Sequence, residues 1–191
     1  MFRVIYADPA WDFRNQKTGG NHTSGASQQY PTMPLAAIQA LPVQPVTAPV
    51  AALFLWVPTA LKFSHGPTTA LAWGFPDYRT TIYWKKDRLG MGFWYRNMVE
   101  ELLVFTRGDH RPFLCQLPNV VSAPREEHSR KPEAFRRHIE AATGMALSGS
   151  HVELFARRKV PGWTTMGHGA SGLDLRAELT GAYLAARAGA L

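Results

Sequence analysis

The pattern of apolar and polar positions divides the chain into alternating strand-like and helix-like segments. Continuous apolar or β-branched runs are typical of buried strands. They occupy residues 2–8, 50–57, 79–84, 101–106, 120–121 and 152–155. Apolar positions at helical spacing, with proline near the start or glycine at the end, predict helices. These helices are expected at residues 34–41, 59–73 with a disturbance at 66–67, 131–143 and 173–188. The alternation predicts an α/β fold with a mainly parallel sheet and helices on both faces.

Several connecting segments have a composition that suggests binding loops. Residues 12–29 are polar and contain several glycines, and a loop of this length is typically a lid or a binding loop, with a plain surface loop as the alternative. Residues 42–49 form a proline-rich connector, and residues 85–92 form a basic loop that contains glycine. A tight turn framed by glycines is expected at residues 167–169.

The overall charge favours a polyanionic partner. The 191 residues, 46% of them hydrophobic, suffice for one globular domain with a sizeable core. Lys and Arg number 21 against 14 Asp and Glu, which gives a net charge of +7. This excess indicates nucleic acid first, and a merely basic surface is the alternative.

The number of cysteines, the spacing of the histidines and the hydropathy argue against disulfide-bonded, metal-binding and membrane proteins. Cys115 is the only cysteine, which excludes an internal disulfide and a cysteine-cluster zinc site. The seven histidines lack the tight spacing of metal ligands, so no metal is expected. No apolar run reaches transmembrane length and no signal peptide opens the chain, so we expect no membrane partner. The expected location is the cytoplasm, in a bacterial host if the protein is encoded by a phage.

The stretch from Val4 to Trp11 combines a buried strand with a potential ligand site. Pro9 cannot continue a sheet ladder, so the strand should end at Asp8. Open α/β sheets place their ligands at the carboxyl ends of strands. A carboxylate, a rigid backbone carbonyl and the flat indole of Trp11 together suit an exocyclic amine on a planar base.

The same residues resemble a known family. Tyr6-Ala7-Asp8-Pro9-Ala10-Trp11 is similar to the Asp-Pro-Pro-Trp signature of the MT-A70-like adenine-N6 methyltransferases, typified by the eukaryotic messenger-RNA N6-adenosine methyltransferase. Further blocks follow in the family's order: Tyr30-Pro31-Thr32-Met33, Leu55-Trp56-Val57, Trp73-Gly74-Phe75, Trp84-Lys85-Lys86-Asp87, Gly90-Met91-Gly92-Phe93-Trp94, Ala123-Pro124-Arg125, His128-Ser129-Arg130-Lys131-Pro132 and Glu153-Leu154-Phe155-Ala156-Arg157. The resemblance covers nearly the whole chain and is closest to the bacterial and phage branch. An unrelated α/β enzyme is the alternative, although the chain has no G-x-G-x-x-G or P-loop motif.

The resemblance implies a fold and an activity. It implies a Rossmann-like S-adenosylmethionine-dependent methyltransferase fold in one domain over residues 1–191, with the catalytic motif N-terminal and the cofactor motifs C-terminal. The implied reaction transfers a methyl group from S-adenosylmethionine to N6 of adenine. The compact chain favours DNA over RNA as the substrate. An RNA methyltransferase and a non-catalytic nucleic-acid-binding subunit of a methyltransferase complex remain alternatives, and a homodimer remains open.

The resemblance assigns the catalytic role to Asp8, Pro9 and Trp11. The Asp8 carboxylate and the Pro9 carbonyl would accept the two N–H bonds of the adenine amine and stabilise its developing positive charge. Trp11 would stack on the base. Ala10 replaces the second proline of the family motif, which we read as a tolerated change, with a catalytically silent paralogue as the alternative.

The cofactor site would be formed by the distant C-terminal half together with the first motif. Its expected members are Ala7, Asp8, Lys131, Arg157, Lys159, His168 and Gly169. Lys131, at the start of a helix, would hold the methionine carboxylate. Arg157 matches the position that contacts the nucleoside, and Lys159 falls near the ribose position. His168 and Gly169 depart from the family, which often has Asn followed by Gln or Glu there.

The substrate groove would be built by three loops, residues 11–29, 85–97 and 125–130. The expected substrate-binding residues are Trp11, Arg14, Lys86, Asn97, Glu100, Arg125, His128 and Arg130. Asn97 and Glu100 match family positions that line the substrate pocket. The basic residues expected to meet phosphates are Lys86, Arg88, Arg96, Arg125 and Arg130. Phe93 or Trp94 could stack on unpaired bases, with a core position as the alternative for Trp94.

Overall fold

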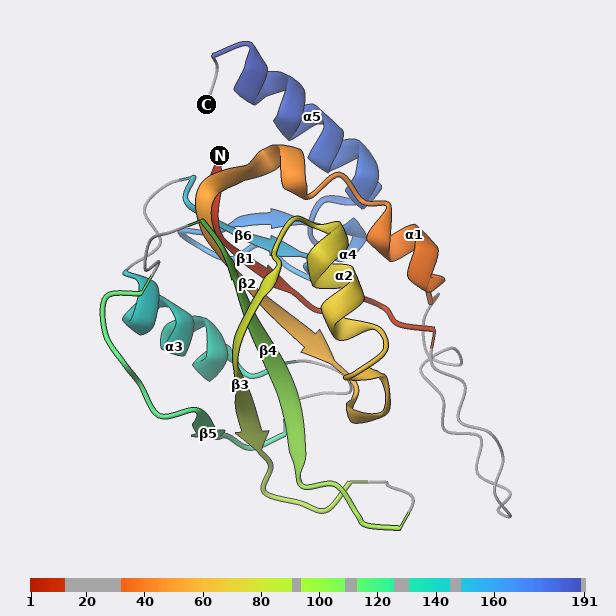
Figure 1. The fold of residues 1–191 in the computed structure, drawn as a ribbon, viewed down its shortest axis with the longest axis vertical. Coiled ribbons are helices and arrows are strands. Elements are labelled where there is room, and N and C mark those ends of the chain that lie inside the picture. The colour runs from red at the N-terminus through yellow and green to blue at the C-terminus, as the bar shows by residue number, and fades with distance from the viewer. Residues whose placement is uncertain (13–31, 91–93, 109–112, 126–130, 145–148, 190–191) are drawn as a thin grey trace.

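The computed structural model describes residues 1–12, 32–90, 94–108, 113–125, 131–144 and 149–189. Figure 1 shows a central sheet with helices packed on both of its faces. The strands are β1 (Phe2–Ala7), β2 (Thr47–Val57), β3 (Asp77–Lys85), β4 (Val99–Arg107), β5 (Val120–Ser122), β6 (His151–Leu154) and β7 (Thr164–Met166). The α-helices are α1 (Leu35–Gln39), α2 (Gly66–Ala72), α3 (Glu133–Thr143), α4 (His168–Ser171) and α5 (Leu175–Arg187), with 3-10 turns η2 (Gln44–Val46) and η3 (Thr59–Leu61).

The seven strands form one sheet in the order β5-β3-β4-β2-β1-β6-β7. β4 runs antiparallel to both of its neighbours, whereas the other neighbouring pairs are parallel. The sheet is therefore mainly parallel, as the alternation of elements predicted. Ala7, the last residue of β1, pairs with Leu55 on one side and Leu154 on the other. This pairing places Asp8 at the carboxyl ends of three adjacent parallel strands.

The two faces of the sheet are covered by different helices. Ile5 and Ala7 of β1 point into a cluster that includes residues of α1, α2 and α5. Val4 and Tyr6 point into a second cluster that includes residues of α3. Successive side chains of a strand alternate between faces, so a strand apolar on both faces is buried between two layers. The prediction of helices on both faces is confirmed (Figure 1).

Several predicted boundaries are corrected by the structure. The 42–49 connector instead contains η2 and the start of β2, and Pro49 lies where the pairing of β1 with β2 is irregular, a position at which a strand tolerates proline. The helix expected at 59–73 is broken into η3 and α2, and Pro67 lies in the first turn of α2. The sequence analysis missed β7 and α4, because elements of three and four residues carry too little periodicity. Among the described helices, none combines the length and apolar character that a bilayer span needs.

Candidate active site

The Asp8-Pro9-Ala10-Trp11 segment leaves the sheet in a tightly bonded conformation. The Trp11 N–H donates to the Pro9 carbonyl at 2.9 Å, and the Ala10 carbonyl accepts from the Met33 N–H at 2.8 Å. The Trp11 indole donates to the Trp56 carbonyl of β2 at 2.9 Å. These bonds fix the backbone just after β1, so the Asp8 side chain has a defined position although Ala10 replaces a proline.

Lys131 bridges two carboxylates that come from different parts of the chain. Its Nζ lies 3.2 Å from Asp8 Oδ1 and 3.2 Å from Glu100 Oε2. Glu100 also pairs through Oε1 with Lys86 Nζ at 2.5 Å. The four side chains form a row of alternating charges, in the order Asp8, Lys131, Glu100 and Lys86. Because β4 is antiparallel, its first residues, which include Glu100, lie at the sheet end where β1 finishes.

The two lysines of this row also lie against indole rings. Lys131 Nζ is 5.0 Å from the centre of the Trp56 ring, and Lys86 Nζ is 5.2 Å from that of Trp84. Both indoles are buried in the cluster beneath α3. Such cation–π contacts attract an ammonium group and also hold it in one place.

Burial and the neighbouring charges together shift the pKa values of the two carboxyl groups in opposite directions. Burial raises the pKa of the Asp8 carboxyl, and Glu100 adds to the rise, while Lys131 and Arg157 oppose it. Burial would also raise the pKa of Glu100, but Lys131 and Lys86 outweigh it, so this pKa is lowered. Burial disfavours the charged form of Lys131, but Asp8 and Glu100 dominate and raise its pKa to about 12. At neutral pH, Lys131 therefore stays protonated between two carboxylates.

Arg157 and the turn after β7 lie close to this row. Arg157 follows β6 and contributes to the electrostatics of Asp8. A Cβ on Gly169 would lie 2.7 Å from Arg157 Cα, and one on Gly167 would lie 2.6 Å from the Ala156 backbone nitrogen. Gly167 also has a φ of +146°, which other residues rarely adopt. Glycine is thus required at both positions for the 167–169 segment to pack against the end of β6, and the turn predicted there is the N-cap and first residues of α4.

Three of the predicted cofactor residues, Asp8, Lys131 and Arg157, therefore lie close together at one end of the sheet. Lys131 precedes the N-cap residue, Pro132, of the eleven-residue helix α3, whose N-terminus attracts anions. An ammonium group has three N–H donors, and the contacts to Asp8 and Glu100 account for two of them. The third donor suits a ligand that carries a carboxylate, and the nearby, exposed Arg157 suits polar groups elsewhere on the same ligand. This set fits S-adenosylmethionine. Lys159, His168 and Gly169 are exposed, whereas Ala7 is fully buried, so any contact from Ala7 would involve its backbone.

The structure corrects two predicted contacts with the substrate. Lys86 is only 8% exposed and is paired with Glu100, so it does not offer its charge to a phosphate. Trp11 is 4% exposed and belongs to the core, so in this conformation it has no open face on which a base could stack. Lys86 instead pairs with Glu100, and Trp11 anchors the segment after β1 to the Trp56 carbonyl. The sequence could not reveal this, because the partners are distant along the chain.

The remaining substrate residues lie on the surface or outside the described ranges. Asn97 and Arg125 are exposed; the Asn97 carbonyl accepts from Gly90 N–H at 2.7 Å, and the Arg125 N–H donates to Asp87 at 3.2 Å. Trp94 is 96% exposed, so the alternative that it belongs to the core is wrong. Other predicted residues lie outside the described part of the chain: Arg14, Phe93, His128 and Arg130.

A separate cavity of about 930 Å³ lies away from this site. Phe54, Ile82 and Val104 of the sheet line it together with Ile139 of α3. Other lining residues, such as Asp77, lie at the opposite end of the sheet from Asp8. The predicted site residues do not line this cavity, and the sequence analysis did not anticipate it.

Comparisons with known proteins agree with the geometry. The sequence profile described as MT-A70 matches residues 2–169, which include every element from β1 to the first residues of α4. The chain is also 32% identical over 184 residues to the Type II methyltransferase M.MunI of Mycoplasma sp, and the match covers 87% of this chain and 76% of that protein. The chain belongs to the MT-A70 family.

Proposed function

We propose that this protein is an S-adenosylmethionine-dependent methyltransferase that methylates N6 of adenine in DNA. The observation that carries the proposal is the convergence of Asp8, Lys131 and Glu100 at the carboxyl end of β1, with Arg157 close enough to affect Asp8. Membership of the MT-A70 family and the similarity to a Type II methyltransferase support the same reaction. The sheet, mostly parallel with helices on both faces, is consistent with a Rossmann-like methyltransferase fold.

Asp8 would act on the acceptor amine rather than as a strong base. The lone pair of an adenine amine is delocalised into the ring, so the nitrogen is a poor nucleophile. An ionised Asp8 accepts one N–H bond and stabilises positive charge as it develops on the nitrogen. The Pro9 carbonyl already accepts the Trp11 N–H, and its second lone pair remains for the other N–H bond of the amine. S-adenosylmethionine would supply a methyl group on a positively charged sulfur.

Lys131 would have two tasks in this site. Its charge favours the ionised forms of Asp8 and Glu100, and its remaining donor would bind the cofactor carboxylate together with the N-terminus of α3. Arg157 and the 167–169 turn would contact the nucleoside part of the cofactor, and Lys159 the ribose. Correct placement of the two reactants is the other large contribution to the rate.

The DNA would approach the same end of the sheet. The loop between β3 and β4 carries exposed Trp94, Arg88 and Arg96. β5 runs parallel to β3, so Arg125, which follows β5, lies at the same end of the sheet. Exposed basic and aromatic side chains suit phosphates and unpaired bases. An adenine in a duplex has to leave the stack before its amine can reach Asp8.

The test is methyl transfer from labelled cofactor to DNA and RNA, followed by digestion to nucleosides. We expect label in N6-methyladenine from DNA, and none with the Asp8→Ala variant, which should keep its fold. Label in N4-methylcytosine, or in RNA alone, would overturn the substrate assignment. A wild-type protein with no binding of S-adenosylmethionine by isothermal titration would instead favour a non-catalytic subunit.

A further inference from the structure

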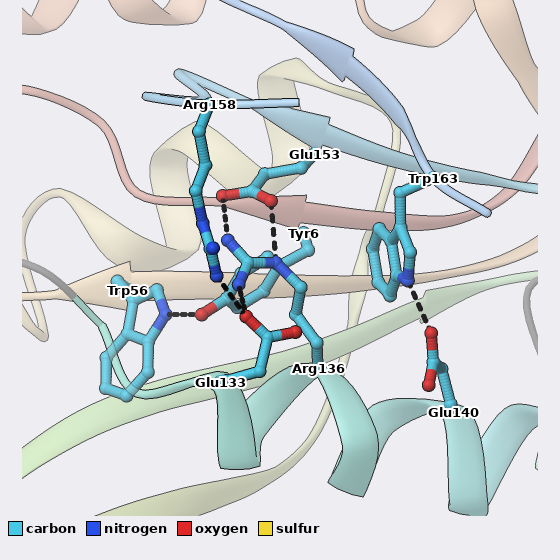
Figure 2. A network of polar contacts seen from close by, with 8 residues as sticks. All are labelled: Tyr6, Trp56, Glu133, Arg136, Glu140, Glu153, Arg158 and Trp163. Atoms are coloured by element: carbon cyan, nitrogen blue, oxygen red, sulfur yellow. Dashed lines mark hydrogen bonds and ion pairs between the residues drawn. The ribbon is translucent and has the colours of Figure 1, made fainter. Parts of the chain in front are cut away.

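A charged network lies beneath the first turns of α3, next to the proposed cofactor site. Arg136 is 7% exposed and makes two bonds of 2.8 Å to the Glu153 carboxylate of β6, through Nε and one terminal nitrogen. Its other terminal nitrogen reaches Glu133 at 2.5 Å. Glu133 also accepts from Arg158 at 2.6 Å. Figure 2 shows the four side chains converging between α3 and β6.

One side of this network leads to Lys131. The Arg136 guanidinium lies 5.9 Å from the centre of the Tyr6 ring. The Tyr6 hydroxyl accepts from the Trp56 indole at 2.8 Å, as Figure 2 shows. The Trp56 ring in turn lies beneath the Lys131 ammonium at 5.0 Å. Arg136 therefore supports, through two buried aromatic side chains, the surface on which Lys131 rests.

The other side of the network leads to Arg157. Glu153 lies in β6, and Arg158 immediately follows Arg157. Phe155, which lies between Glu153 and Arg158 in the chain, has a φ of +62°, in the left-handed region that residues other than glycine rarely adopt. Such a conformation is strained and persists only when the surroundings hold it. Glu153 and Arg158 bond to α3 from both sides of this residue.

We propose that Arg136 is a positioning residue that fixes Lys131 relative to Arg157 and so holds the cofactor site in its binding geometry. The inference rests on the proposed function, because it assumes that these two residues bind one cofactor. A buried ion pair is a weak source of stability, since the desolvation of both charges offsets their attraction. The network should therefore matter more for the geometry of the site than for the stability of the fold.

The decisive experiment compares cofactor affinity with DNA affinity in matched variants. Arg136→Met alone would leave Glu153 buried and unpaired, so the main variant is the double change Arg136→Met with Glu153→Gln. We expect its Kd for S-adenosylmethionine, measured by isothermal titration, to rise about tenfold. KM for DNA at saturating cofactor should stay within about twofold of wild type. Arg136→Lys with Glu153 intact should recover only part of the affinity, because an ammonium cannot reproduce the two-pronged bond.

Two further variants provide an independent change in the network and a control on the same helix. Arg158→Ala removes a half-exposed partner of Glu133 and should fold normally, with an increase of about threefold in the cofactor Kd. Glu140→Ala is the control on the same helix; it removes the 2.6 Å bond from the Trp163 indole (Figure 2) and should leave the cofactor Kd unchanged. The inference fails if the folded double variant and Arg158→Ala bind the cofactor like wild type, or if Glu140→Ala weakens binding as much. A wild-type protein without cofactor binding would refute the proposed function itself.

Discussion

Replacing Glu100 by glutamine should make Asp8 a stronger acid. The Glu100 carboxylate is one of the groups that raise the pKa of Asp8, after burial itself. Glutamine has nearly the same shape and no charge. It would also leave the Lys131 ammonium paired with Asp8 and no longer shared with a second carboxylate of the row, which favours the ionised form of Asp8 further. Both effects lower the pKa of Asp8.

The magnitude follows from the geometry of the charge row. The nearest oxygens of Asp8 and Glu100 are each 3.2 Å from Lys131 Nζ, so they are separated by at most twice that distance. Two unit charges about 6 Å apart repel by about 2.8 kcal/mol at an effective dielectric constant of about 20. The side chains are 27% and 35% exposed, so water reduces this value. A remaining repulsion of about 1 kcal/mol corresponds to about 0.7 pKa unit.

The assay is the pH dependence of kcat/KM for methyl transfer to DNA, measured at saturating cofactor. In the wild type, the acid limb should lie above the ordinary pKa of an aspartate, because Asp8 has to be ionised to accept the amine. In Glu100→Gln, this limb should move to lower pH by about half to one unit. An unchanged limb, or one that moves to higher pH, would refute the electrostatic coupling. Asp77→Asn, at the opposite end of the sheet, serves as the control and should leave the limb in place.

Three further predictions test other parts of the site. Because the pKa of Asp8 is raised in the folded state, ionised Asp8 opposes folding above the ordinary pKa of an aspartate. Asp8→Asn should therefore leave the Tm at pH 7 equal or higher, and it should abolish turnover because asparagine carries no negative charge. A marked fall in Tm would contradict this. Trp94→Ala should weaken DNA binding in fluorescence anisotropy by about 5- to 150-fold with no change in Tm, and unaltered affinity would exclude base stacking by this fully exposed indole. Gly169→Ala should weaken cofactor binding in isothermal titration at least about tenfold, since its Cβ would lie 2.7 Å from Arg157 Cα. Gly181→Ala in α5 meets open space and should bind the cofactor normally.

The sequence by itself determined six of the seven strands, the main helices and the place of the acidic group. β1, β2, β4 and β6 are apolar runs that are largely buried, so their signal is local and can be recognised without knowledge of their neighbours. Pro9 ends β1 because it lacks an N–H, which put Asp8 at the strand end. The order of the family motifs indicated that Lys131 and Arg157 would share a site with Asp8.

Only the tertiary structure decided the direction of β4 and the partners of the charged side chains. Strand direction depends on pairing between residues far apart in the chain, and the antiparallel β4 is what brings Glu100 to the end of β1. The burial of Lys86 likewise depends on Glu100 and Trp84. The charge of Lys86 in a basic segment predicted a contact with phosphate, which these surroundings exclude. A pattern along the chain reports which residues are charged, whereas the packing of distant segments decides what each charge can reach.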